Sequence, residues 1–351
     1  MNETTTIGID LAKEVFAVCV LDAHGAVLER RVLRRDAFER WAAARPACTV
    51  AMEACSSAHH WGRWFASRGH IARLIAPEFI EGFRKGGKND SNDAEAIAIA
   101  CRQPTMRFVP IKTAEQQAIL SWHRARQGWI EERTALVNRL RGLLAEFGIA
   151  LGRSGDRLLG ALPALSEDEH LPAPVRALLL EARAQFAALH ERLARCDAEV
   201  AAHGRDCANA HLARELLGVG ALTASALVAT VPNAAMFKNG RQFAAWVGLT
   251  PRQHSSGGKT RLGATSRHGD AYLRCLLVQG ARSALQAALK APPQRASRLQ
   301  AWIAALYARK GYHVTLVAIA NKHARLLWAM LARGEHYDPH AWQRHPRTQT
   351  A

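Results

Sequence analysis

The sequence contains no hydrophobic run of the about 20 residues that a membrane-spanning helix requires. Its first ten residues, MNETTTIGID, also lack the basic start and apolar stretch of a secretory signal peptide. Together these two absences predict a cytoplasmic protein that has no membrane partner.

Closely spaced cysteine pairs are missing as well. The seven cysteines are scattered along the chain, and none belongs to a CxxC or CxH pair. We therefore expect neither a zinc site nor a disulfide framework, and we interpret the cysteines as small buried hydrophobic residues.

Acidic residues are few compared with basic ones. The chain has 30 Asp and Glu against 47 Lys and Arg, which gives a net charge of +17. Residues 238–282 concentrate this imbalance, with eight basic residues and one acid, Asp270. Because each basic side chain placed against a phosphate releases counterions, such clustering favours a nucleic-acid partner. A surface adapted to an arginine-rich proteome is the alternative interpretation.

The composition is that of globular domains, and 351 residues suffice for two or three of them. We predict an α/β domain at 1–110, a helical segment at 111–206, a mostly helical domain at 207–337 and a polar tail at 338–351. In the first domain, strands at 5–10, 15–21 and 26–32 form a meander. Alternating helices (37–44, 59–67, 90–101) and strands (48–54, 71–75) follow. This order is that of the ribonuclease H-like fold.

Two long helices are predicted in the middle of the chain. A capping-box pattern at 113–116 precedes a helix that extends to about residue 147, and glycines and prolines at 148–173 end it. A second helix carries apolar residues at alternating spacings of four and three: Val175, Leu179, Ala182, Phe186, Leu189, Leu193, Cys196 and Val200. This coiled-coil seam fits an intramolecular helical hairpin and a dimerisation stalk equally well.

Four carboxylates stand where the predicted elements end or begin. Asp10 and Glu53 end apolar strands, and Asp90 and Asp93 open a helix. A carboxylate at a buried strand end is costly unless a cation lies beside it. Oxygen donors without His or Cys select a hard cation, so we predict Mg²⁺ or Mn²⁺ bound by these four residues. Taken singly, each acid could be a helix cap or a solvated charge, and Asp90 in particular could cap its helix.

The motifs around these acids, GIDLAK at 8–13, MEA at 52–54 and KNDSNDA at 88–94, resemble the DEDD transposases of the insertion-sequence-110 family. The N-terminal domain of that family is similar to RuvC-type Holliday-junction resolvases. The resemblance implies that Asp10, Glu53, Asp90 and Asp93 are catalytic metal ligands. It spans residues 5–335, nearly the whole chain.

Three C-terminal motifs carry the same resemblance. Residues 216–224 (LLGVGALTA) resemble a helix-hairpin-helix turn, in which Gly218 and Gly220 would let backbone N–H groups approach a DNA phosphate. The other two, 243–251 with QHSSGGK at 253–259 and RHGDAYLR at 267–274, resemble the family's transposase domain. LxGVG is equally common as an ordinary tight turn between helices.

The SSGGK turn is a candidate nucleophile site in its own right. Two glycines leave a serine open to a bulky phosphodiester, and a serine attack would join the protein covalently to DNA. A flexible polar loop is the alternative interpretation, but the family resemblance favours Ser256 over Ser255 as the nucleophile. We expect the nucleic-acid contacts at five basic side chains: Arg252, Lys259, Arg261, Arg267 and Arg274.

The predicted function is therefore DNA strand exchange by an insertion-sequence transposase. The resemblance further implies a bridge RNA that pairs with donor and target DNA, a dimer or tetramer, and a bacterial, nucleoid-associated protein. A RuvC-type nuclease without serine chemistry is one alternative, although it leaves residues 208–335 without a task. A non-catalytic nucleic-acid-binding protein is the other, although it does not explain the acids at the strand ends. The sequence specifies neither the target and donor sequences, the RNA, the oligomeric state nor the number of metal ions.

Overall fold

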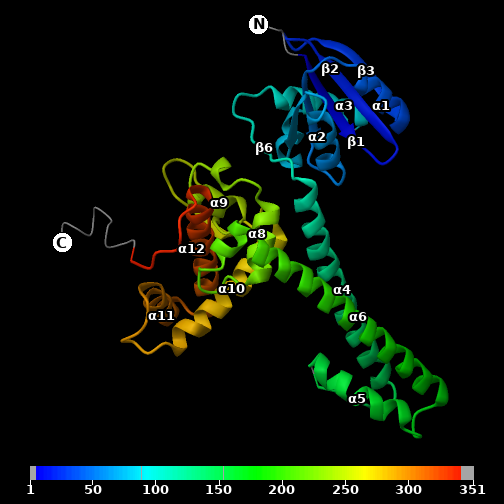
Figure 1. The fold of residues 1–351 in the computed structure, drawn as a ribbon, viewed down its shortest axis with the longest axis vertical. Helices are drawn as coiled ribbons and strands as arrows, with labels where there is room; N and C mark the ends of the chain where they lie inside the picture. The colour runs from blue at the N-terminus through cyan, green and yellow to red at the C-terminus, as the bar shows by residue number, and fades with distance from the viewer. Residues whose placement is uncertain (1–4, 88, 153, 341–351) are drawn as a thin grey trace. The chain divides into compact units, whose positions relative to one another are not determined.

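The computed structural model describes residues 5–87, 89–152 and 154–340, and the chain divides into two compact units, residues 1–114 and 115–351. Figure 1 traces the chain by colour through both units. The predicted boundaries near 206 and 337 lie inside the second unit, so the division into four parts stays a prediction. Most of the predicted tail, from residue 341 onward, lies outside the described residues.

A six-stranded sheet organises the first unit, in the order β3-β2-β1-β4-β5-β6. The strands are β1 (Thr6–Leu11), β2 (Val15–Leu21), β3 (Val27–Arg34), β4 (Thr49–Glu53), β5 (Ile71–Ile75) and β6 (Phe108–Val109). Strands β1, β2 and β3 form an antiparallel meander, and β4 and β5 continue the sheet in parallel with β1. This topology fits the ribonuclease H-like fold, as the order of elements in the sequence predicted.

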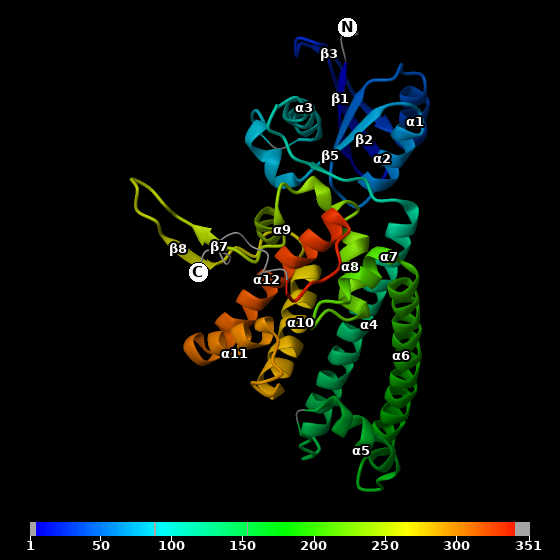
Figure 2. The same cartoon turned by 60° about the vertical axis from the view of Figure 1, so that its left-hand side comes forward.

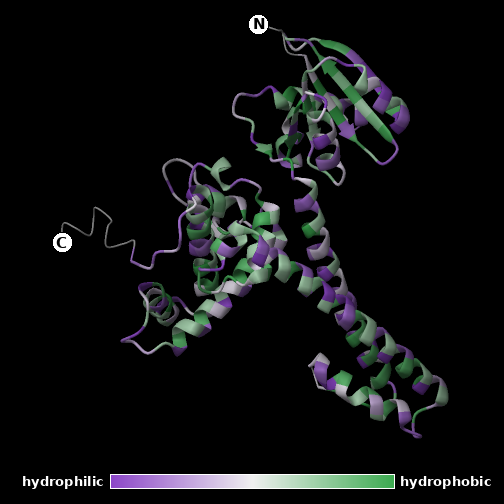
Figure 3. Ribbon diagram, viewed as in Figure 1, coloured by the Kyte–Doolittle hydropathy of each residue, from purple (hydrophilic) through white to green (hydrophobic). Residues whose placement is uncertain are grey.

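Helices cover both faces of this sheet. Helices α1 (Arg35–Ala43) and α2 (Ala58–Ala66) pack on one face through Phe38, Trp61 and Phe65, and α3 (Asp90–Cys101) packs on the other. The central strands β1, β2 and β4 are mostly hydrophobic (Figure 3), because both of their faces are buried, whereas the edge strand β3 is largely exposed. The two layers fix which way each strand residue points.

Gly8 lets α3 lie directly against β1. A Cβ at this position would come within 2.2 Å of the Ala94 carbonyl oxygen and 2.8 Å of the Ala98 Cβ. Only glycine therefore permits so close an approach. The first turn of α3 is consequently held over the C-terminal half of β1.

Three helices form the beginning of the second unit: α4 (Ala114–Ala145), α5 (Gly155–Glu167) and α6 (Ala173–Asp206). The α6 stripe is buried from Leu179 to Val200, and its N-terminal half packs against leucines of α4 and α5 in the same chain. Helix α5 was missed from the sequence, because its segment contains glycines and Pro163. The seam is thus filled within the chain, while its use between chains stays a prediction.

The rest of the second unit consists mainly of helices around one core: α7 (Ala208–Ala213), α8 (Ala221–Thr230), α9 (Gly240–Trp246), α10 (Ala271–Lys290), α11 (Arg298–Lys310) and α12 (Tyr312–Arg333). Strands β7 (Pro251–Gln253) and β8 (Leu262–Thr265) form an antiparallel hairpin between α9 and α10. In Figure 2 this hairpin projects away from the helices of its unit. No helix among the described residues is both long and apolar enough to cross a membrane.

Candidate active-site residues

Asp10 and Glu53 lie on the same edge and the same face of the sheet. In the parallel pair of β1 and β4, Ile9 faces Met52, and the two acids are the next residues along. Because side chains alternate along a strand, Asp10 shares the face of Gly8, which α3 covers. Glu53 likewise shares the face of Ala51, which packs against α3 residues. Both acids are partly exposed.

Helix α3 brings the other two acids toward this edge. Asn89 is its N-cap, since its side chain accepts a hydrogen bond of 2.8 Å from the Asn92 backbone N–H. Asp90 is therefore not the cap, and that alternative is wrong. Asp93 directly precedes Ala94, whose carbonyl lies against Gly8. Lys88, from the same motif, lies outside the described residues.

The side chains themselves do not form a closed metal site. Among the described residues, which include all four acids, no three His, Cys, Asp or Glu side chains lie close enough to hold one ion. The Asp93 carboxylate instead accepts a hydrogen bond from the Arg84 guanidinium. The binding of a metal by these four acids stays a prediction.

The candidate nucleophile stands at the tip of the β7–β8 hairpin. Residues 256–259 form a tight turn, in which the Lys259 backbone N–H donates to the Ser256 carbonyl at 3.0 Å. Gly257 and Gly258 have φ values of 56° and 76°, the left-handed region that such a hairpin turn requires at both central positions. The sequence SSGGK thus forms a defined turn and not an irregular loop.

The two neighbouring serines differ in their hydrogen bonds. The Ser255 hydroxyl accepts from the Arg261 backbone N–H at 3.2 Å and from the Gln253 side-chain amide at 3.0 Å. No group within the described part of the chain bonds the Ser256 hydroxyl, and this residue is exposed. Ser255 therefore holds the hairpin together, whereas Ser256 presents an unengaged hydroxyl.

The predicted basic contacts fall into two groups. Lys259 and Arg261 are exposed on the hairpin with Ser256, and Arg252 at its base approaches the Ser266 carbonyl at 3.4 Å. Arg267 is exposed and has a φ of 58° in the turn that leads to α10. Arg274 instead donates to the Val247 and His268 carbonyls, at 2.9 and 3.0 Å. Arg274 thus braces this turn whether or not it also contacts a phosphate.

The turn at 216–224 joins α7 to α8, as its pattern predicts, but its two glycines have different surroundings. Gly218 has a φ of 87°, and a Cβ there would come within 2.4 Å of the Gly280 carbonyl on α10. Close packing against α10 therefore explains why this position is a glycine. Gly220 is exposed before α8 with open space around its Cα, so nucleic-acid binding at this turn stays a prediction.

A buried polar network lies in the second unit, among residues that had not been singled out from the sequence. Ser225 on α8 contacts His123 of α4 and His203 of α6 at 3.0 and 2.9 Å, and His123 contacts the Tyr272 hydroxyl of α10 at 3.0 Å. Burial lowers the pKa of His123 to about 4 and raises the pKa of Tyr272 to about 12. Both side chains are therefore neutral near pH 7. These residues lie far apart in the sequence, so no local pattern signals the network.

Comparison with known proteins identifies the family. The model described as "Transposase IS116/IS110/IS902 family" matches residues 210–298, and the IS110 DEDD model, described as "Transposase", matches residues 7–149. The chain is 45% identical over 336 residues to a "Probable family 20 transposase" of Pseudomonas aeruginosa, covering 95% of this chain and 98% of that protein. The chain belongs to the IS110 family of transposases.

Transposases of insertion sequences are similar to this IS110-family chain over most of its length. The transposase for insertion sequence element IS1111A of Coxiella burnetii is 36% identical over 96% of this chain and 92% of its own length. The transposase for element IS1328 of Yersinia enterocolitica is 36% identical over 95% of this chain and 98% of its own length. The resemblance stated from the sequence motifs is thereby confirmed, and the enzyme is a DNA transposase.

Proposed function

We propose that this transposase exchanges DNA strands by serine chemistry, with Ser256 as the nucleophile. The observation that carries the proposal is the unengaged Ser256 hydroxyl at an exposed hairpin tip between basic side chains. The two following glycines have no heavy atom within 4 Å of an added Cβ, so a phosphodiester can approach closely. A buried serine on a helix would offer neither access nor counter-charge.

The proposed cleavage step conserves the phosphodiester bond energy. The Ser256 Oγ attacks phosphorus, a P–O bond to one DNA strand breaks, and a phosphoserine link forms. The proton of the hydroxyl leaves as the leaving oxygen of the DNA gains one. Lys259 and Arg261 stabilise the negative charge that builds on the phosphate oxygens. Attack by a second strand end on the phosphoserine reverses the step and rejoins the DNA.

We further propose that Asp10, Glu53, Asp90 and Asp93 hold Mg²⁺ or Mn²⁺. Support comes from their oxygen-only donor set and from the backbone placement of Asp10, Glu53 and α3 at one edge of the sheet. In this arrangement Asp93 exchanges its Arg84 partner for the ion. When bound, such an ion activates a nucleophile or stabilises a leaving oxygen in phosphodiester chemistry.

The metal proposal has a test that does not depend on activity. Titrating Mn²⁺ into the protein should give calorimetric binding that Asp10→Asn weakens strongly, while Asp36→Asn does not. Asp36 is a matched control because it lies in the first turn of α1 and is exposed beside Arg40. Equal binding by all three proteins would exclude the predicted ligand set.

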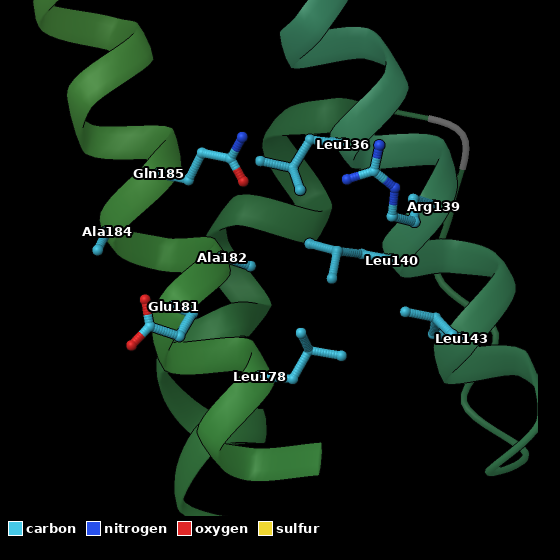
Figure 4. A pocket seen from close by; sticks show the side chains of 9 residues that line it. All are labelled: Leu136, Arg139, Leu140, Leu143, Leu178, Glu181, Ala182, Ala184 and Gln185. Atoms are coloured by element: carbon cyan, nitrogen blue, oxygen red, sulfur yellow. The ribbon is translucent and has the colours of Figure 1, made fainter. Parts of the chain in front are cut away.

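The proposed partners are donor and target DNA, a bridge RNA and further copies of the transposase, acting at the bacterial nucleoid. The net charge of +17 supports the polyanions. A groove between α4 and α6 supports self-association, because Leu140 and Leu178 point into it and Arg139 and Glu181 line it (Figure 4). One charge of each sign would allow two copies of this surface to face each other as a dimer, or as part of a tetramer.

A recombination assay tests the proposed function. Supercoiled donor and target plasmids are incubated with the transposase, Mg²⁺ and RNA that co-purifies with it, and joined products are counted. Ser256→Ala should abolish the product, whereas Ser255→Ala should reduce it by loosening the hairpin. RNA-independent nicking that survives in Ser256→Ala would favour the RuvC-type nuclease instead, and binding without any strand chemistry would favour a non-catalytic protein.

A further inference from the structure

The last three helices form a stretch of chain without acidic residues. From 271 to 334, between Asp270 and Glu335, the sequence contains no Asp or Glu and ten Lys and Arg. Asp270 itself is engaged, since its carboxylate accepts a hydrogen bond of 2.7 Å from the Leu273 backbone N–H as the N-cap of α10. The charge of this stretch therefore has no carboxylate of its own to balance it. The serine hairpin at 251–265 accounts for none of these ten residues.

Part of this charge gathers at the corner between α11 and α12. Helix α11 ends at Lys310 and α12 begins at Tyr312, with Gly311 alone between them at a φ of 72°. Every residue from 307 to 314 is exposed. We call these eight residues the α11–α12 corner.

Two tyrosines flank two basic side chains at the α11–α12 corner. Tyr307 and Tyr312 are 36% and 39% exposed, and Arg309 and Lys310 lie between them in the sequence. The His313 ring contacts that of Tyr312 edge-on, with 5.3 Å between the ring centroids. Exposed rings of this kind offer faces on which bases stack, while the neighbouring cations contact phosphates.

The corner is attached firmly to the core of its unit. Leu306 on its N-terminal side and Thr315 and Leu316 on its C-terminal side are buried. The exposed side chains can therefore be replaced without opening the core. Tyr307 and Tyr312 nevertheless keep more than a third of their surface exposed, and this aromatic surface remains to be explained.

We propose that the α11–α12 corner binds unpaired nucleotides of the RNA, with Tyr307 and Tyr312 stacking on bases and Arg309 and Lys310 contacting phosphates. Stacking requires a base outside a duplex, and a structured RNA offers such bases in its loops, whereas donor and target DNA are duplexes until they are cleaved. This inference rests on the proposed RNA partner. It adds a second nucleic-acid surface to the one on the serine hairpin.

The test measures the binding of a labelled oligouridylate of about 12 nucleotides to the full-length protein by fluorescence anisotropy. The double variant Tyr307→Ala/Tyr312→Ala should bind about fivefold or more weakly for each ring that stacks on a base. Tyr307→Phe/Tyr312→Phe keeps both rings and should bind like the unsubstituted protein. Arg309→Ala/Lys310→Ala should flatten the log–log salt dependence by up to about 1.4 units, at about 0.7 for each phosphate contact on a single strand.

Three controls separate this surface from its alternatives. Arg183→Ala removes an exposed charge on α6 and should leave the affinity for the oligouridylate almost unchanged. A duplex DNA should bind the Tyr→Ala double variant as well as it binds the unsubstituted protein. Circular dichroism and melting should confirm that the fold is intact.

The proposal would be overturned if the unsubstituted protein did not bind the oligouridylate, or if the Tyr→Ala and Tyr→Phe double variants bound it equally well. An equal loss of affinity for duplex DNA would overturn it too. Equal dependence on both rings for oligothymidylate would assign the corner to single-stranded DNA and overturn the RNA assignment. Because binding is measured without strand exchange, failure of the serine mechanism would leave these results unchanged.

Discussion

His123 and His323 are both buried in the second unit, at 1% and 0% exposure, but their hydrogen bonding differs. His123 contacts Tyr272 through one ring nitrogen and Ser225 through the other. Within the described residues, neither ring nitrogen of His323 on α12 has a partner. The pKa of each falls to about 4, mainly because of burial and to a smaller extent because of neighbouring basic side chains. His123 thus links three helices, α4, α8 and α10, whereas His323 makes no hydrogen bond with its ring in the part of the chain that the structure describes.

These pKa shifts predict a loss of stability in acid. A histidine with a lowered pKa in the folded state binds fewer protons there than when unfolded. The stability that depends on the neutral, buried histidine is fully present above pH 6.5 and is lost as the pH falls from 6.5 toward about 4. Each such histidine should lower the free energy of unfolding of its unit by up to about 1.4 kcal/mol per pH unit in that range. Urea unfolding at pH 7 and pH 5 measures this difference.

Substitutions separate the two histidines. His323→Leu removes an unsatisfied polar group and should keep or raise stability at pH 7, with a smaller loss at pH 5. His123→Leu leaves Ser225 and Tyr272 without their shared partner and should cost about 1–3 kcal/mol. If both variants unfolded at the same urea concentration, the contrast in hydrogen bonding would have no energetic consequence.

At the scale of elements, the α6 stripe fixes the fold of the α4–α5–α6 segment. Leu189 is 1% exposed and belongs to the same cluster as Leu140 of α4 and Leu158 of α5. Leu189→Asp buries an unpaired charge and should lower the melting temperature of the second unit markedly. Leu180→Asp, on the exposed side of α6, is the matched control and should change it little. An unchanged melting curve for Leu189→Asp would show that the stripe is not packed in solution.

The β7–β8 hairpin is the element on which the salt dependence of DNA binding should depend. Lys259 and Arg261 are exposed on it beside Ser256. Replacing both by Ala should flatten the log–log slope of affinity against salt by up to about two units if both contact phosphates. Replacing Arg274, which is hydrogen-bonded to two carbonyls, should instead destabilise the turn before α10. A slope unaltered by the Lys259/Arg261 change would place the phosphate contacts elsewhere.

Elements with a strong local pattern could be predicted from the sequence. Strand β5 and helix α3 begin and end at the predicted residues, 71–75 and 90–101, because turn-forming and helix-capping residues flank them. Helix α5 could not be predicted, since Gly155 and Pro163 are unfavourable in isolation and packing of Leu158 and Leu162 compensates for them. The hairpin was interpreted only as a turn, because its strands are three and four residues long and almost fully exposed, so no alternation of apolar and polar residues marks them.

Only those candidate site residues that stand at the ends of recognisable elements could be singled out from the sequence. Asp10, Glu53 and Asp90 could be singled out from the sequence, because they stand near the ends of β1 and β4 and at the start of α3. The pairing of Asp93 with Arg84 and the engagement of the Ser255 hydroxyl depend on side-chain geometry, which no periodicity specifies. The network around Ser225 could not be predicted either, because His123 is 102 positions from Ser225 and 149 positions from Tyr272 in the sequence.

At the scale of the whole molecule, the chain combines a ribonuclease H-like unit that carries the acids with a basic, mostly helical unit that carries the serine hairpin. The family assignment covers both, because its two models match residues 7–149 and 210–298. Metal-activated water in the first unit and serine attack in the second would leave different products. The central claim is that the DNA is cleaved by serine attack.

The most direct measurement traps the reaction on a nicked or mismatched DNA substrate, digests the DNA and identifies the modified peptide by mass spectrometry. A serine attack predicts a phosphoserine-linked nucleotide on the peptide that contains residues 255 and 256. Ser256→Ala should abolish the adduct, Ser255→Ala should only slow its formation, and Asp10→Asn should abolish it if the metal assists the attack. Cleaved DNA with free 5′ and 3′ ends, and no adduct in any variant, would contradict the account and leave a metal-dependent nuclease.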